Sequence, residues 1–262
     1  MFEVTRYEAN RRVRSTLVLA VGLGLFGLLV IGIFPSVEAS GVDFEAYVES
    51  LPDAFQESFG GGSFGTIEGF LAAEFYQFVW VLLFGLYMAY TAGGTIAGNV
   101  ENGRLDLLLA TPISRSRVVV EKYLSLLTPI VVLNLLMPLF VYGAVILIGE
   151  SISFVDLLLV HAFSIPYLLA CTSIGLVLSV VLPRGDLAQR GGIAAIFLLF
   201  VFDSVTAGTD FEALGAVSPT RYYDTTEILV EQTYDIGGAV ILLLAAFLLL
   251  AVARALFLRA DL

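Results

Sequence analysis

The chain has 262 residues, of which 58% are hydrophobic and only 14% are charged, and its mean hydropathy is +0.93. Soluble domains carry about a quarter charged residues, so this excess of apolar side chains requires a bilayer as part of the surroundings. The net charge of −11 argues against a nucleic-acid partner, which would need a basic surface.

Six apolar runs are long enough to cross a membrane, which takes about 20 residues per span. They predict an all-α, polytopic membrane protein in which residues 1–262 form a single transmembrane domain. The first run is not expected to be a cleaved signal peptide, because it has full span length and is followed by Pro35 and an acidic segment. The second run looks over-long and the fifth looks short. The predicted spans are residues 16–34, 71–97, 123–148, 156–182, 191–207 and 236–257.

Basic residues predict the orientation, because loops rich in Lys and Arg stay in the cytoplasm. With the N-terminus inside, twelve of the thirteen basic residues lie in the cytoplasm and only Arg221 lies outside. Both termini are therefore expected in the cytoplasm, and the protein is expected in the cell (plasma) membrane. Residues 2–15 predict an amphipathic helix along the inner interface, with Arg6, Arg11, Arg12 and Arg14 on it.

The outer segments are acidic, and the chain has a single lysine against twelve arginines. Concentrated salt screens charge within a few ångströms, so a halophilic archaeal source is one hypothesis. The alternative is neutral drift of an unconstrained surface.

Two outer segments are long enough to hold structure of their own. In residues 36–70, apolar positions recur in steps of three and four from Phe44 to Phe59, which predicts an amphipathic helix on the outer surface. Its simplest role is to cover the spans. Residues 208–235 are too polar to span and predict short outer helices, with Arg221 paired to a nearby carboxylate.

The inner loop at residues 98–122 is the most specific part of the sequence. Asn102-Gly103 predicts a turn, and an apolar run from Leu105 to Leu109 follows between charged residues. Pro112 ends that run, and Ser114 is a suitable N-cap for the next helix. An apolar surface held between two helix ends is typical of docking to a soluble partner.

This loop resembles the signature region of ABC type-2 transporter permeases, the membrane subunits of many exporters. The family pattern is E-x-G-T-L-x-x-L-L-x-x-P-x-S/T-R, with a Lys near the next span. Arg104 stands where the family often has Thr, in the solvated turn. The similarity extends along the chain, in the N-terminal helix, the six spans and the long outer segment before the last span. The matching residues are Glu101, Gly103, Leu105, Leu108, Leu109, Pro112, Ser114, Arg115 and Lys122.

The resemblance implies the permease subunit of an ABC transporter, an exporter that forms the substrate pathway and couples to a separate ABC ATPase. A second permease protomer, identical or related, would complete the pathway in the lipid bilayer. The coupling helix would run over residues 101–109. The chain has no G-x-x-x-x-G-K-[ST] loop, so ATP would be used by the partner; this chain is expected to bind no cofactor and to be no enzyme. The implied ATPase-coupling residues are Glu101, Gly103, Leu105, Leu108, Leu109, Pro112 and Arg115.

Few polar residues lie inside the predicted spans. Asn134, between two prolines, is expected either to bond to backbone freed by the prolines or to contact the substrate. His161 and Cys171 are expected to be packing residues, and one of each excludes a disulfide or a metal site that needs two. The pairs Gly93-Gly94 and Gly191-Gly192 permit close helix approach.

Two other classes stay open. A membrane-embedded enzyme needs a nucleophile with its base, or paired carboxylates; H-E-x-x-H is absent and the inner acids are sparse. A non-transporting scaffold or an ion channel would have no ATPase partner. Co-purification of an ATPase therefore separates the exporter from both.

Overall fold

The computed structural model describes residues 2–40, 65–110 and 113–260. Within these residues the regular structure is helical throughout, which confirms the prediction of an all-α protein. The helix predicted around Phe44 and Phe59 lies outside the described residues, and so does Pro112. Six helical stretches are apolar and long enough to span a membrane, as predicted: Glu3–Ala39, Ile67–Glu101, Arg115–Leu147, Phe154–Val181, Gly185–Thr206 and Ile236–Arg259.

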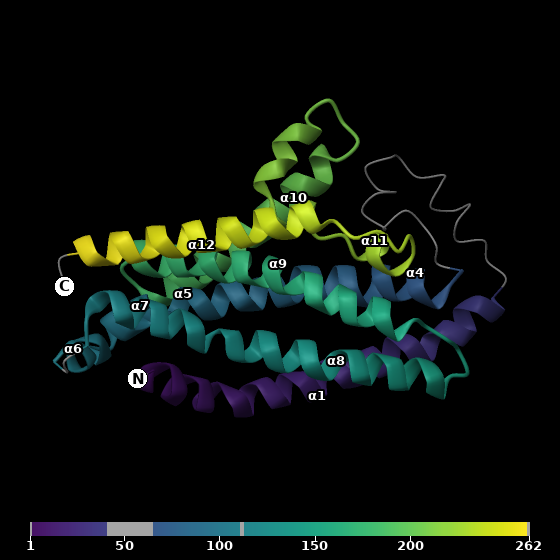
Figure 1. Cartoon of the computed structure of the whole chain (residues 1–262), viewed down its shortest axis with the longest axis horizontal. Helices are drawn as coiled ribbons and strands as arrows, with labels where there is room; N and C mark the ends of the chain where they lie inside the picture. The colour runs from purple at the N-terminus through teal and green to yellow at the C-terminus, as the bar shows by residue number, and fades with distance from the viewer. Residues whose placement is uncertain (1, 41–64, 111–112, 261–262) are drawn as a thin grey trace.

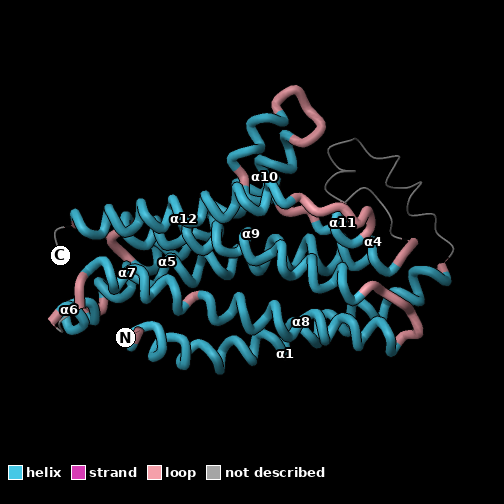
Figure 2. The backbone as a smooth tube through the Cα atoms, viewed as in Figure 1, coloured by secondary structure: helices cyan, strands magenta, loops and turns pink. Residues whose placement is uncertain are grey.

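The long helices lie along a common axis, with both termini at the same end (Figure 1). Most of the turns between the spans lie at the two ends of this bundle, and the turn after α10 (Gly185–Thr206) projects from its side (Figure 2). An even number of spans returns the chain to its starting side, and the excess of Lys and Arg assigns that side to the cytoplasm. We call it the inner end.

The first helix, α1 (Glu3–Ala39), runs without a break through the boundary predicted near residue 15. Its 37 residues are about 55 Å long at 1.5 Å per residue, against a hydrocarbon core of about 30 Å. The basic N-terminal turns are therefore a continuation of the span beyond the core, rather than a separate interfacial helix. They pack against α7 (Arg115–Ser125) at the inner end.

The second span is built from three consecutive helical pieces, α4 (Ile67–Leu71), η2 (Ala72–Phe84) and α5 (Gly85–Glu101). The piece η2 is a π-helix, a form that elsewhere is mostly limited to a single turn. It buries Tyr76 and Trp80 completely in the bundle. The sequence indicates an over-long span but not this conformation.

The middle of the bundle is packed backbone to backbone. A Cβ added to Gly175 of α9 (Phe154–Val181) would lie 2.3 Å from the Ala89 carbonyl oxygen of α5. A Cβ on Gly192 would lie 2.7 Å from the same atom, and one on Gly93 would lie 2.6 Å from the Ala188 carbonyl oxygen. The close approach predicted for the glycine pairs is confirmed, and small residues are what permits it.

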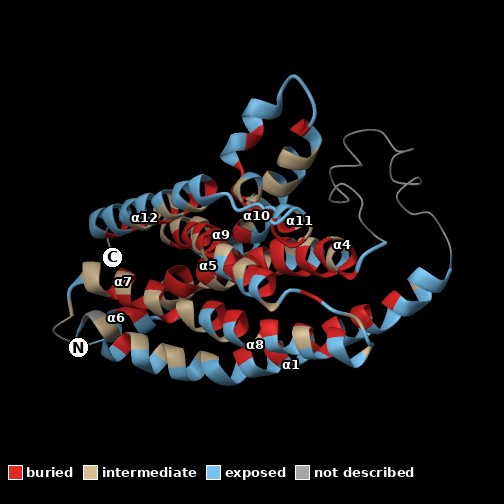
Figure 3. Ribbon diagram, turned by 45° about the vertical axis from the view of Figure 1, so that its right-hand side comes forward, coloured by how far each residue is buried: buried red, intermediate tan, exposed pale blue. Residues whose placement is uncertain are grey.

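Burial decreases from the centre of the bundle outward (Figure 3). The outward faces of α1, α10 (Gly185–Thr206) and α12 (Ile236–Arg259) are apolar and exposed. Such faces are suited to lipid or to a second protomer. Examples of these exposed side chains are Leu17, Val18, Leu25, Leu198, Phe247 and Leu248.

The last turns of α10 and the turn after it stand away from the bundle, whereas the rest of α10 packs on α5 and α9 (Figure 1). The chain returns through three short helices, η3 (Glu212–Val217), η4 (Pro219–Tyr222) and α11 (Thr225–Leu229), as predicted. Arg221 pairs with Glu212, so the local ion pair predicted for the one outer basic residue is confirmed. The remaining helix, α8 (Leu127–Leu147), continues α7 across the membrane.

Candidate functional site

At the inner end, the short helix α6 (Arg104–Leu109) connects span two to span three (Figure 1). The predicted single helix over residues 101–109 is divided. Glu101 is the last residue of α5, and Gly103 precedes α6 with a φ of 62°. A left-handed conformation is readily available to glycine and stops an α-helix, so the sequence of the turn sets the start of α6.

The two faces of α6 have different roles. Leu105 is 1% exposed and anchors the helix on the bundle, and Leu108 is partly buried against the same core. Leu107 is 74% exposed and points away from it. Among the α6 side chains that the structure describes, Leu107 is therefore the projecting apolar one, although the family pattern does not include it. Helical spacing provides the signal, because residues three apart share a face and residues two apart do not.

Glu101 links α5 to the start of α10. Its Oε2 atom accepts a hydrogen bond of 3.0 Å from the backbone N–H of Gly185, the first residue of α10. This N–H is one that a helix leaves without an internal partner, and a carboxylate is favourable beside a helix N-terminus. A Cβ on Gly185 would lie 2.9 Å from the Gly98 Cα atom, so the two helix ends touch.

Glu101→Ala should lower the free energy of unfolding by about 1 kcal/mol, the usual cost of losing a helix cap. Asp106→Ala is the matched control, because Asp106 is an exposed carboxylate on α6. Thermal unfolding in detergent measures the change in stability of both variants. Equal melting temperatures for the two variants would contradict a stabilising role for the Glu101 contact.

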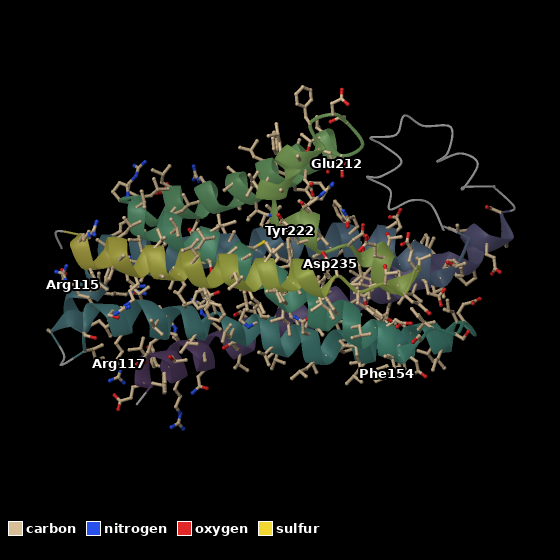
Figure 4. The ribbon with its side chains drawn as sticks, turned by 45° about the horizontal axis from the view of Figure 1, so that its top comes forward. Arg115, Arg117, Phe154, Glu212, Tyr222 and Asp235 are labelled. Atoms are coloured by element: carbon tan, nitrogen blue, oxygen red, sulfur yellow. The ribbon has the colours of Figure 1, made fainter. Side chains whose placement is uncertain are left out.

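The start of α7 is tied to the end of α12. Arg115 Nη1 donates a hydrogen bond of 2.7 Å to the Ala260 carbonyl oxygen, and Arg254 Nε donates to Ser116 Oγ. Ser114 Oγ accepts from the Arg117 backbone N–H at 3.3 Å, which confirms the predicted N-cap. Figure 4 shows Arg115 and Arg117 at this end of the molecule.

The start of α1 is held by α7. Glu121 is 1% exposed, and its Oε2 atom accepts from the backbone N–H groups of Val4 at 3.0 Å and Thr5 at 3.2 Å. These are among the first N–H groups of α1, which lack partners inside the helix. Lys122 Nζ donates to Glu8 Oε1 at 2.8 Å. Helices α5 and α7 also contact each other, so the inner ends of α1, α5, α6, α7, α10 and α12 form one connected group, which we call the inner platform.

The chain matches the family described as "ABC-2 family transporter protein" over residues 3–262. It belongs to the ABC-2 transporter family. The protein is accordingly a permease subunit of an ABC transporter, multi-pass in the membrane, and the resemblance seen in the inner loop is confirmed at the level of the family. A search of curated proteins gives no match.

Away from the platform, the ABC-2 permease has a buried polar network in its outer half. Asn134 Oδ1 accepts a hydrogen bond of 2.8 Å from Ser164 Oγ and lies 3.1 Å from His161 Nδ1. His161 Nε2 lies 3.2 Å from Tyr76 Oη, and Trp80 Nε1 donates to Ser164 Oγ at 3.1 Å. The network joins α8 and α9 to the π-helix η2, and it confirms that His161 is a satisfied packing residue.

Asn134 does not compensate for the prolines. Pro138 lacks the N–H that would bond to the Asn134 carbonyl, but the Asn134 side chain donates instead to the Ile130 carbonyl oxygen at 2.8 Å. Cys171 is fully buried, as predicted for a core residue. No group of three or more His, Cys, Asp or Glu side chains within the described ranges is arranged to hold a metal ion.

Proposed function

We propose that this ABC-2 permease is the membrane subunit of an exporter driven by a separate ABC ATPase, which docks on α6. The observation that carries the proposal is the geometry of α6. A projecting apolar residue, Leu107, lies on a helix anchored by buried Leu105 at the inner end. An exposed apolar side chain on a fixed helix is suited to insertion into a groove of a partner.

Motion of α6 would reach most of the spans through the inner platform. The Gly103 turn joins α6 to α5, and the Glu101 contact joins α5 to α10. Arg115 joins α7 to α12, and Glu121 joins α7 to α1. ATP-driven closure of the ATPase would thereby shift several helix ends together. The proposed coupling residues are Glu101, Gly103, Leu105, Leu108, Leu109, Pro112 and Arg115, and we add Leu107 because its side chain is exposed.

The proposal includes a second permease protomer, because the exposed apolar faces of α1, α10 and α12 are suited to contact with another protein as well as with lipid. The substrate pathway would lie within this assembly in the plasma membrane. Asn134 is a proposed pathway residue, and contact with the substrate would require the His161–Ser164 network to open. This chain would bind no cofactor, and ATP would be used by the ATPase.

The direct experiment is purification of the tagged permease from its native membrane in a mild detergent. We expect an ABC ATPase to co-purify in a fixed ratio to the permease and two permease chains to be present in the complex. If the intact permease is recovered repeatedly without an ATPase, the exporter assignment fails and a membrane scaffold becomes the better hypothesis.

The high-salt habitat is a further proposal, tested by stability. Burial raises the pKa of Glu227, and the nearby carboxylates of Asp224, Glu231 and Asp235 raise it further, so like charges are crowded in this outer segment. Raising KCl to about 1 M shortens the screening length to about 3 Å. We expect the melting temperature of the permease to rise by several degrees as KCl is raised to about 1 M. A melting temperature that falls instead would contradict adaptation to salt.

A further inference from the structure

A cleft of about 910 Å³ lies at the inner end between the first turns of α1, α6 and α7. Tyr7, Arg11, Arg104, Arg117 and Lys122 are among the residues that line it. An adjoining cleft of about 320 Å³ shares part of this wall and includes Arg12, and it reaches residues of α5 and α10. We call the two together the basic cleft.

The charges in the basic cleft are not balanced within the described part of the chain. Lys122 pairs with Glu8, and Arg117 pairs with Glu121 at 2.5 Å. By contrast, the side chains of Arg11, Arg12 and Arg104 form no ion pair with any residue that the structure describes. Glu8 also interacts with the charges of Arg11 and Arg12. Glu3 and Glu8 are the two carboxylates in the described lining, against five basic side chains, so the lining keeps an excess of positive charge.

Arg12 gives a second, independent indication. Its Nε atom is shielded from solvent and has no hydrogen-bond partner among the described residues. Buried N–H groups in proteins are nearly always paired, so the Arg12 guanidinium keeps donor capacity that the described residues do not satisfy. Guanidinium groups offer a planar fork of donors that matches the oxygen atoms of a phosphate.

The depth of the cleft indicates where an acceptor for these donors would come from. Arg12 lies four residues before Thr16, the predicted start of span one, so it sits at the inner membrane surface. Tyr90 and Thr91 of α5 also line the cleft, and they lie inside the predicted span of residues 71–97. The basic cleft therefore crosses the membrane surface, which is the level of phospholipid headgroups. A soluble protein would reach only its outer part.

We propose that the basic cleft binds the phosphate of an anionic phospholipid of the inner leaflet, with Arg11, Arg12 and Arg104 as its ligands. The acyl chains would follow the exposed apolar residues of α1 that succeed Arg12, which include Val13, Leu17 and Val18. The site shares α6 with the proposed docking surface, since Arg104 and Leu108 line it, but Leu107, the projecting residue, is absent from the lining.

The test measures binding of short-chain phosphatidylglycerol to the purified permease, with phosphatidylcholine of equal chain length and inorganic phosphate as comparison probes. We expect saturable binding of phosphatidylglycerol that weakens as salt is added. The double variant Arg12→Gln/Arg104→Gln should raise its Kd at least about 10-fold, since charge-assisted hydrogen bonds are lost. Arg184→Gln is the matched control, because Arg184 is a 64% exposed inner basic residue outside the lining.

Gel filtration and ligand-free melting temperature show whether the double variant is folded. An unchanged Kd in a folded double variant would overturn the proposal, and so would equal binding of phosphatidylcholine. If inorganic phosphate binds as tightly as phosphatidylglycerol and competes with it, a phosphate site is supported but the lipid source is overturned.

Discussion

Leu107→Asp is expected to remove the ABC ATPase from the purified permease without unfolding it. The Leu107 side chain is 74% exposed, so a charge there disturbs little inside this chain. In an interface, an apolar residue at the centre of a contact is worth about 2 kcal/mol or more, which is a loss of affinity of about 30-fold. Quantitative mass spectrometry of the co-purified ATPase and the ATPase rate of the complex both measure this loss.

Leu214→Asp is the control for this prediction. Leu214 lies in η3 at the outer end and is 54% exposed, so the same substitution there changes the surface without touching the inner platform. Retention of the ATPase in Leu214→Asp and its loss in Leu107→Asp is the expected pair of results. Equal retention in both variants would contradict docking on α6. Leu108→Asp is a weaker test, because Leu108 is partly buried and its loss would also damage the fold.

The second large effect is expected from Gly175→Ala. The new Cβ would lie 2.3 Å from the Ala89 carbonyl oxygen, a backbone atom that cannot rotate away, so α5 and α9 must separate. Overpacking of this kind destabilises by about 3 kcal/mol when the helices cannot relax. Gly192 contacts the same carbonyl oxygen, so any separation also strains the packing of α10. Thermal unfolding in detergent should show a large fall in the melting temperature.

Gly143→Ala provides the comparison. Gly143 lies in α8, and a Cβ there has no atom within 4 Å. Alanine is favoured over glycine inside a helix by about 0.5–1 kcal/mol, so this variant should be neutral or slightly more stable. If Gly175→Ala and Gly143→Ala melt together, the close contact between α5 and α9 is not present in the protein.

Features with local causes could be predicted from the sequence. Apolar runs of span length predicted the six spanning helices, and Ser114 predicted the N-cap of α7. The close approach at Gly93 and Gly192 followed from the absence of side chains. In each case the signal lies within one continuous stretch of sequence.

Features that depend on distant contacts could not be predicted. The π-helix η2 has no signature in its sequence, and its buried face is complemented by His161 and Ser164, about 85 residues away in the chain. Nothing in the sequence around Glu121 distinguishes it from a surface carboxylate, and only the fold brings it to the N-terminus of α1. The orientation of α6 also needed the structure, because only the bundle decides that Leu105 faces inward and Leu107 outward.

Site-specific crosslinking tests the central claim, docking of an ABC ATPase on α6, most directly. Cys171 is the single native cysteine and is fully buried, so a photoreactive thiol reagent should attach selectively to a new exposed cysteine. In native membranes, Leu107→Cys should crosslink to an ABC ATPase, and Leu214→Cys should not. An ATPase adduct at Leu214→Cys alone, or no adduct at Leu107→Cys in membranes that retain transport activity, would contradict it.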